Sequence, residues 1–210
     1  MLGTHDLALF IVSGLLLNLA PGPDTLYIVG RSSTQGYRAG AAAALGIFAG
    51  TFVHIAAAAG GLSALLAASA SAFTVVKIAG AIYLAYIGIS LLRSPVQSGA
   101  TGPGLAPASL HQVFVQGFFT NVLNPKVALF FLAFLPQFVD PDAPSKAAAL
   151  FFLGAIFNLN GTLWNLFVAW SSARISGGLM RNARFARWFN RCVGGLFVVL
   201  GVKLALSSER

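Results

Sequence analysis

Charged residues and cysteine are both scarce in this chain of 210 residues. Asp, Glu, Lys and Arg make up 9% of the chain, whereas a soluble domain typically carries about 25%. Hydrophobic residues make up 57%. This composition excludes an ordinary soluble fold. The single cysteine, Cys192, excludes an intramolecular disulfide and a dithiol redox pair.

Several sequence patterns of enzymes and metal sites are also missing. The chain has no GxSxG, no glycine-rich nucleotide loop and no His/Cys/Asp cluster with metal-ligand spacing. Its histidines, His5, His54 and His111, are too scattered to define a site. We therefore expect no enzymatic activity, no metal, no cofactor and no direct use of ATP. The N-terminus lacks a basic n-region, so the first segment is expected to remain in the mature protein.

Long hydrophobic runs are what the chain does contain. A helix that crosses a bilayer needs about 20 apolar residues, and six such stretches predict an all-α integral membrane protein with six transmembrane helices. The predicted spans are residues 7–30, 40–67, 73–92, 113–136, 147–173 and 188–206.

The net charge of +8 is distributed unevenly between the two faces that six spans would create. One face carries Arg31, Arg38, Arg93, Arg174, Arg181, Arg184, Arg187 and Arg191. The other carries Lys77, Lys146, Lys203 and Arg210 beside Asp6, Asp140, Asp142 and Glu209. The positive-inside rule predicts that the arginine-rich face is cytoplasmic, with both termini periplasmic or extracellular. The segment 181–191 is expected to contact anionic lipid headgroups, and no nucleic-acid partner is expected.

The first hydrophobic run is interrupted, and a similar sequence pattern occurs in the second half of the chain. "GLLLNLAPGPD" begins at Gly14 and "GFFTNVLNPK" begins at Gly117. Each reads Gly, three residues and Asn, then a proline followed closely by an ionisable residue. This repeat divides a single transporter domain, 1–210, into repeat 1 (about 1–95), a Gly/Pro/Ser/Ala-rich linker (about 94–112) and repeat 2 (about 113–210).

Three spans in each half give the two repeats opposite orientations in the bilayer. Inverted repeats whose matching helices are broken by proline are typical of secondary transporters, with the site near the midplane. We therefore expect broken first and fourth helices. The break residues Pro21, Gly22, Pro23 and Pro125 are expected beside the substrate cavity, since irregular backbone at membrane depth must line protein or water.

Asp24 and Lys126 follow the two breaks and carry opposite charges. A charge at the centre of a membrane helix costs about 2.5–3.5 kcal/mol on insertion scales, so both are candidates for substrate binding and proton coupling. We expect them to face one cavity and to pair there when it is empty. A static ion pair that only fixes helix packing is the alternative interpretation.

Further candidates are polar residues inside predicted spans. Asn18, Asn121 and Asn124 lie at the breaks, where they cap the half-helices, bind substrate or hydrogen-bond between helices. His54 is a candidate proton relay or cavity residue, although we favour a histidine bonded to a neighbouring helix. Asn158 and Asn165 share one helical face and are expected to line the cavity. Gly46 and Gly50 form a GxxxG pattern that predicts close helix packing.

These motifs resemble the LysE/RhtB family of amino-acid exporters. The resemblance covers essentially the whole chain. It is carried by "NLAPGPD" (Asn18–Asp24), "RAGAAAALGIFAG" (Arg38–Gly50), "KIAGAIYLAYIGISLLRS" (Lys77–Ser94), "GFFTNVLNPKVALFFLAFLPQFV" (Gly117–Val139) and "RCVGGLFVVLGVKLAL" (Arg191–Leu206). In the family's motifs, Asp24 matches the acidic residue, Lys126 the basic residue, and Asn18, Pro21, Asn124 and Pro125 the asparagine and proline positions.

The resemblance implies a bacterial inner-membrane exporter of amino acids such as homoserine, threonine, leucine or basic amino acids, coupled to the proton-motive force. The lysine of "NPK" is closer to the neutral amino-acid branch than to the arginine-exporting one. Expected partners are the amino acid, protons and membrane lipids, and the glycine and alanine faces also allow a homodimer. The rival interpretations are an exporter of a small cation or other metabolite, and a membrane thiol-electron carrier.

Overall fold

The computed structural model describes residues 2–20, 22–62 and 107–174, with isolated positions between 75 and 93 and between 191 and 202. Regular structure in these parts is helical, apart from one isolated β-bridge between Thr4 and Val139. The spans predicted at 73–92 and 188–206 lie outside the described residues except for those isolated positions. Most of the predicted linker at 94–112 lies outside them too.

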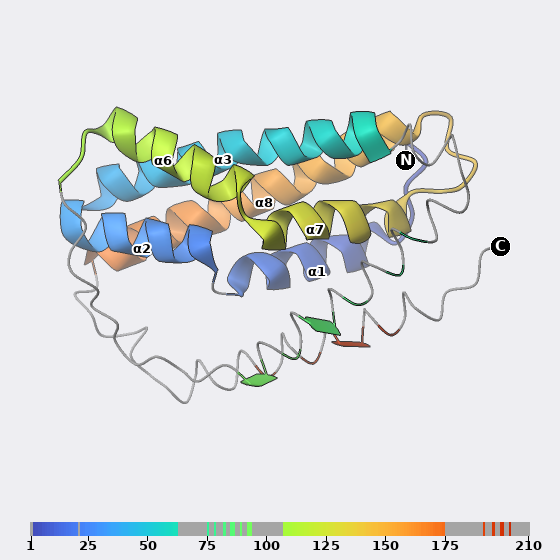
Figure 1. The fold of residues 1–210 in the computed structure, drawn as a ribbon, viewed down its shortest axis with the longest axis horizontal. Coiled ribbons are helices and arrows are strands. Elements are labelled where there is room, and N and C mark those ends of the chain that lie inside the picture. Colours follow the sequence, from blue (N-terminus) through green and yellow to red (C-terminus); the bar gives the residue numbers. More distant parts are fainter. Residues whose placement is uncertain are drawn as a thin grey trace.

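The first predicted span is broken at its prolines. Helices α1 (Leu7–Leu19) and α2 (Pro23–Gln35) meet at an angle of 54° (Figure 1). In a continuous helix the carbonyl of Leu17 would accept a hydrogen bond from residue 21, but a proline has no N–H to donate. Pro23 begins α2, where a missing N–H costs little. The predicted break in the first helix is confirmed.

The second predicted break is also present. Helix α6 (Leu110–Val122) is followed by α7 (Pro125–Ala133) and the short 3-10 helix η2 (Leu135–Phe138), and the two segments are bent by 48°. Asn124 caps α7, because its Oδ1 accepts a 3.0 Å hydrogen bond from the backbone N–H of Lys126. The Asn-Pro pair thus ends one helix and begins the next.

The two remaining long helices are not bent in this way. Helix α3 (Tyr37–Ala56) continues into the π-helix η1 (Ala57–Leu62), and α8 runs from Lys146 to Arg174. Their candidate spans are 25 and 29 residues long, more than the roughly 20 residues that the bilayer core requires. If each bent pair is one span, the described residues contain four candidate spans, and otherwise two.

Helices α3 and α6 pack with their backbones in close contact. A Cβ atom at Gly46 would collide with the carbonyl oxygen of Phe114, and one at Gly50 would lie 2.7 Å from that of Phe118. From the other side, a Cβ atom at Gly117 would lie 2.6 Å from the carbonyl oxygen of Ala43. Because these distances leave no room for a methyl group, the predicted close-packing face is confirmed.

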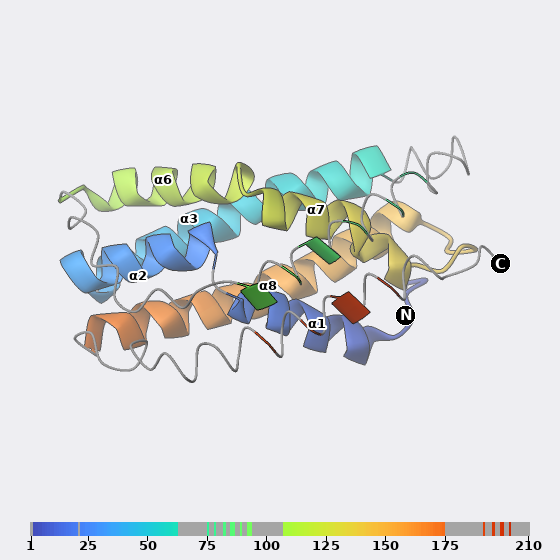
Figure 2. The same cartoon turned by 60° about the horizontal axis from the view of Figure 1, so that its bottom comes forward.

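Two apolar clusters divide the core along the length of the molecule. One contains phenylalanines of α1, α7, η2 and α8, including Phe10, Phe130 and Phe157. The other is built from smaller residues of α2, α3, α6 and α8, including Ile28 and Ile47. Figures 1 and 2 show that both helix breaks lie near mid-length, the first beside α8 and the second beside α3. The breaks thus lie between the clusters, where polar side chains can be accommodated.

Candidate functional site

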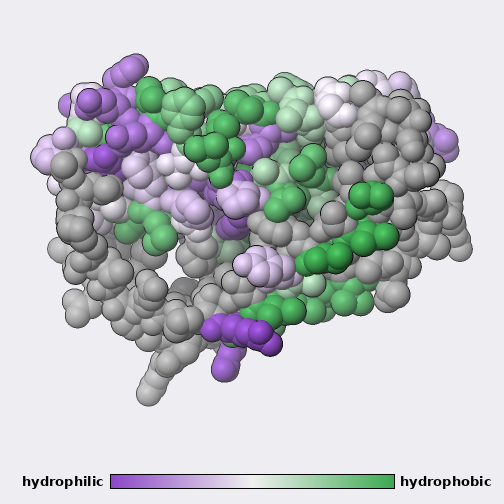
Figure 3. All heavy atoms as spheres, in the orientation of Figure 1, coloured by the Kyte–Doolittle hydropathy of each residue, from purple (hydrophilic) through white to green (hydrophobic). Residues whose placement is uncertain are grey.

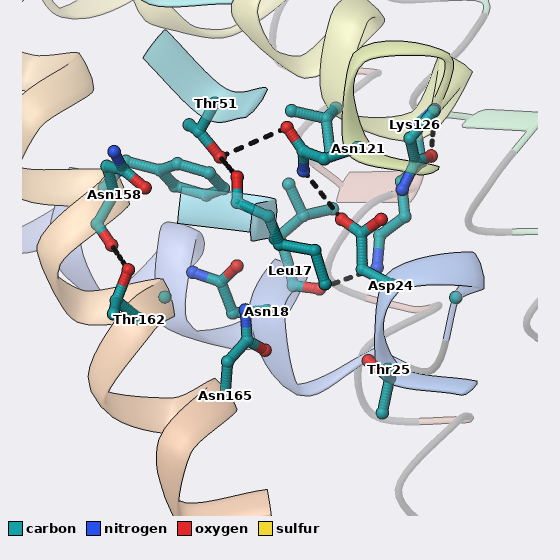
Figure 4. Close-up of a pocket in the computed structure, with 16 residues that line it drawn as sticks. Leu17, Asn18, Asp24, Thr25, Thr51, Asn121, Lys126, Asn158, Thr162 and Asn165 are labelled. Carbon is teal, nitrogen blue, oxygen red and sulfur yellow. Dashed lines mark hydrogen bonds between the residues drawn. The ribbon is translucent and has the colours of Figure 1, made fainter. Parts of the chain in front are cut away.

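A cavity of about 40 Å³ lies between the two helix breaks, α3 and α8 (Figure 4). Leu17 and Phe157 of the first apolar cluster and Ile47 of the second form part of its wall. The predicted site residues that line it are Asn18, Gly22, Asp24, Asn121, Asn124, Lys126, Asn158 and Asn165. Pro23 and Pro125 do not line it, and Pro21 lies outside the described residues.

Asp24 lies in the first turn of α2 and contacts the last turn of α6. Its Oδ2 accepts a 2.8 Å hydrogen bond from Nδ2 of Asn121. Oδ1 of Asn121 lies 3.2 Å from Oγ1 of Thr51, which also lies 3.0 Å from the carbonyl oxygen of Ile47. The positive end of α2 favours a carboxylate at this position. A chain of polar contacts therefore joins Asp24 to α6 and α3.

Lys126 occupies the matching position in the first turn of α7 and contacts the last turn of α1. Its Nζ donates hydrogen bonds of 2.8 Å to the carbonyl oxygen of Leu17 and 2.7 Å to that of Ala20. A cation is unfavourable at the N-terminus of its own helix, but the negative end of α1 offsets this. The ammonium replaces the N–H that residue 21, a proline, cannot supply to Leu17.

The two charged residues line one cavity without forming an ion pair. Among the described residues the one contact that meets a 4.0 Å ion-pair limit joins His5 to Asp6. The expected direct pairing of Asp24 and Lys126 is therefore wrong for this conformation. The physical reason is that each charged group has nearer partners on the opposite bent pair: an asparagine amide for the aspartate and two backbone carbonyls for the lysine.

His54 was one of the candidate cavity residues, but it does not line the cavity. Its Nε2 lies 3.0 Å from the carbonyl oxygen of Asn121, and its ring centroid is 5.9 Å from that of Phe131. These contacts direct the imidazole to the backbone at the end of α6 and away from the cavity. The geometry agrees with the interpretation we favoured, a histidine bonded to a neighbouring helix.

Helix α8 supplies the wall that packs against α1. Asn158 and Asn165 lie on this wall, and between them Gly161 and Thr162 also line the cavity (Figure 4). Nδ2 of Asn158 donates a 3.2 Å hydrogen bond to the carbonyl oxygen of Phe48 on α3. The sequence analysis missed Gly161 and Thr162, although the helical spacing that grouped the two asparagines also includes them.

Threonines on two other helices were missed as well. Thr25 follows Asp24, and Thr51 lies one turn after Ile47 on the face of α3 that meets α6. For Thr51 a signal was present, because it directly follows Gly50 of the close-packing face. Small polar side chains beside a helix contact of this kind commonly bond across it in membrane proteins.

Two buried polar atoms of the lining residues have no hydrogen-bond partner among the described residues. They are Nδ2 of Asn18 and Oδ1 of Asp24. Leaving such an atom unpaired costs about 1–3 kcal/mol. One atom is a donor and the other an acceptor. A small ligand with both an acceptor and a donor group would satisfy the two together.

The cavity is smaller than an amino acid. A volume of about 40 Å³ holds roughly three water molecules. A whole leucine would therefore require the surrounding helices to separate. The polar side chains that line the cavity already surround the place that would have to widen.

Arg31 is buried, with 4% of its surface exposed, whereas the other arginines of the predicted cytoplasmic face that the structure describes are exposed: Arg38, Arg93, Arg174 and Arg191. Its guanidinium donates to Oε1 of Gln35 at 2.8 Å and to Oε1 of Gln116 at 2.7 Å. Tyr27 donates from its hydroxyl to the same Gln116 oxygen at 2.9 Å. This network ties α2 to α6 at the end of the molecule where hydrophilic residues gather (Figure 3).

Comparison with known proteins identifies the family. A family model described as "LysE type translocator" matches residues 15–208, which is nearly the whole chain. The chain belongs to the LysE type translocator family. The resemblance inferred from its motifs is thereby confirmed, and the chain is a multi-pass membrane protein.

Individual relatives agree with this membership. An uncharacterized membrane protein of Pseudomonas aeruginosa is 32% identical over 99% of this chain and 98% of its own length. The leucine efflux protein of Salmonella typhimurium is 27% identical over 93% of this chain and 92% of its own. An uncharacterized membrane protein of Bacillus subtilis is 29% identical over 97% and 100%. No solved structure matches the chain.

In the part of this translocator that the structure describes, no group of three or more His, Cys, Asp and Glu residues is placed to hold a metal ion. The polar groups around the cavity are instead amides, hydroxyls, one carboxylate and one ammonium (Figure 4). A divalent cation prefers several oxygen ligands of high charge, and this set contains one carboxylate.

Proposed function

We propose that this translocator is a secondary active exporter of a small neutral amino acid across the bacterial inner membrane, driven by proton antiport. The observation that carries the proposal is that Asp24 and Lys126, the ionisable residues after the two helix breaks, line one cavity. The name of the Salmonella relative, a leucine efflux protein, makes leucine the first substrate to test.

The proposed architecture is six spans in two inverted three-helix halves. Its support is the equivalence of the two bent pairs. In each pair a proline begins the second helix, and an ionisable side chain in the first turn of that helix contacts the first helix of the other pair. Such an exchange of contacts is expected when two similar units are related by a pseudo-two-fold axis.

In the proposed cycle the amino acid enters from the cytoplasm when the helices around the cavity separate on that side. Its ammonium binds the carboxylate of Asp24, one oxygen of which has no partner among the described residues. After the cavity opens to the outside, an external proton binds the same carboxylate. Neutralising Asp24 weakens the ammonium contact, so substrate leaves and the proton is carried inward.

Lys126 holds the broken end of α1 throughout this cycle. Its two hydrogen bonds to α1 carbonyls keep the break open to the cavity without exposing unpaired backbone oxygens. We place the arginine-rich ends of the helices in the cytoplasm and both termini outside, on the charge distribution. Anionic lipid headgroups are then the partners of the basic segment 181–191.

The direct test is uptake of labelled amino acids into energised inside-out vesicles. The wild-type protein and the Asp24→Asn variant are compared on a panel that includes leucine, threonine, homoserine and lysine. Asp142→Asn is the matched control, because Asp142 is an exposed residue outside the cavity. Proton-dependent uptake that is lost in Asp24→Asn and kept in Asp142→Asn supports the proposal.

Two results would oppose it. If vesicles that contain folded wild-type protein take up no amino acid of the panel, the proposed substrate class is wrong. If Asp24→Asn transports at the wild-type rate with the wild-type pH dependence, the coupling role of Asp24 is wrong.

A further inference from the structure

The cavity has two unsatisfied polar atoms, and they come from the two sides of the first helix break. Asn18 lies on α1 just before the break, and Asp24 lies on α2 just after it. Nδ2 of Asn18 is a donor and Oδ1 of Asp24 an acceptor, and both are buried without a partner among the described residues. Buried polar atoms are nearly always paired in proteins, so two such atoms at one cavity indicate a missing ligand.

Lys126, the other candidate for substrate binding at the breaks, has its ammonium engaged elsewhere. Two of its three N–H groups are used by the carbonyls of Leu17 and Ala20. The amide of Asn18 has no such competitor at Nδ2. Of the two, Asn18 is therefore the donor that stands free for a carboxylate.

Gly161 on α8 fixes where the amide of Asn18 lies. A Cβ atom at position 161 would be 3.0 Å from both Nδ2 and Oδ1 of Asn18 and 3.2 Å from its Cγ. The amide therefore lies directly against the α8 backbone (Figure 4). A methyl group at this position would push the amide by a few tenths of an ångström, into the cavity that the substrate has to enter.

We infer that Asn18 binds the carboxylate of the exported amino acid through Nδ2, while Gly161 positions Asn18 and limits the space beside the carboxylate. The inference rests on the proposed function, because it names the groups that hold the two ends of the same zwitterion. The ammonium end belongs to Asp24. The residues on the two sides of the first break thus bind both charged groups of the substrate. The second break contributes Lys126, which holds α1 in place.

The test compares L-leucine with L-leucinamide, which has the same side chain and ammonium but an amide in place of the carboxylate. Purified full-length protein in detergent is titrated with each compound, and the rise in the thermal unfolding midpoint gives an apparent Kd. Wild type is expected to bind leucine about tenfold or more tightly than leucinamide, the usual effect of a hydrogen bond to a charged group.

Two variants of Asn18 separate recognition from packing. Asn18→Asp turns the donor into an acceptor, so leucine binding should fall about tenfold or more and the preference should reverse in favour of leucinamide. Asn18→Leu, of similar volume, should remove the preference without reversing it. If Asn18 only packs, its variants should weaken the binding of both compounds equally and leave the ratio of the two apparent Kd values as in wild type. That result would overturn the inference.

Gly161→Ala should weaken leucine binding, and Gly60→Ala should not. The second variant is the matched control, because a Cβ atom at Gly60 meets no atom of the described residues within 4 Å. If Asn18→Asp does not fold, the ratio of the apparent Kd values of Asn18→Leu for leucine and leucinamide decides whether Asn18 binds the carboxylate. Wild type that binds no amino acid refutes the proposed function itself. Wild type that binds leucine, with an unchanged ratio in the Asn18 variants, refutes the role of Asn18 alone and leaves the exporter standing.

Discussion

Nζ of Lys126 lies 2.8 Å from the carbonyl oxygen of Leu17, although 109 positions separate the two residues in the chain. A second hydrogen bond joins the same ammonium to the carbonyl oxygen of Ala20. Pro21 has no N–H to donate to the carbonyl of Leu17, and Ala20 caps the end of α1, where the carbonyls have no intrahelical donor. The lysine of one half of the chain thus completes the helix end of the other half.

Removing this ammonium should destabilise the protein. Lys126→Met leaves the two α1 carbonyls without their donor, and an unsatisfied buried group costs about 1–3 kcal/mol. The thermal unfolding midpoint in detergent should therefore fall clearly below that of wild type. Lys146→Met is the control, because Lys146 begins α8 away from the cavity. Equal midpoints for the two variants would show that Lys126 does not hold α1.

The polar chain from Asp24 to α3 predicts a graded effect on transport. Asn121→Leu removes the 2.8 Å hydrogen bond to Asp24 directly. Thr51→Val removes a 3.2 Å contact to the far side of the same amide. We expect initial uptake rates in vesicles to fall more in Asn121→Leu than in Thr51→Val, because the first variant frees the carboxylate itself. The opposite order would separate Asn121 from the function of Asp24.

The local features of this fold could be predicted from sequence, and the long-range contacts could not. The breaks followed from proline chemistry, and the glycine face followed from its four-residue spacing, because both are properties of one helix. The partners of Lys126, the burial of Arg31 and the turn of His54 toward Asn121 depend on which helix packs beside which. No periodicity in a single helix contains that information.

The helical spacing of polar residues also identified only part of the cavity wall on α8. Asn158 and Asn165 were grouped because they are polar, whereas Gly161 between them carries no side chain and gave no chemical signal. Its importance appears once Asn18 is seen to lie against it. The six-span inverted architecture remains a prediction, since two of its spans lie largely outside the described residues.

Close packing of α3 against α6 predicts that added methyl groups are costly. In Gly46→Ala and Gly117→Ala the new Cβ atom meets a backbone carbonyl, which cannot rotate away as a side chain can. Overpacking of this kind typically costs about 1–3 kcal/mol. Both variants should therefore unfold at lower temperature than wild type, while Gly60→Ala should match it. Wild-type stability of Gly46→Ala would mean that the two backbones are farther apart than described.

The buried Arg31 network predicts a stability loss at the other end of α2. Gln116→Leu removes the oxygen that accepts from both Arg31 and Tyr27. We expect a loss of about 1–3 kcal/mol, the cost of removing one partner of the buried Arg31 guanidinium. Gln112→Leu is a weaker control, because Gln112 only completes the capping box of α6 at an exposed site. Thermal unfolding of both variants in detergent measures the difference.

Coupled movement of leucine and protons tests the central claim most directly. Proteoliposomes that hold leucine and a pH-sensitive dye are diluted into leucine-free buffer, and internal pH is recorded as leucine leaves. The account predicts that the interior acidifies with wild-type protein, since protons enter as leucine exits, and that it does not with Asp24→Asn. Leucine release by wild type without any acidification would contradict proton antiport.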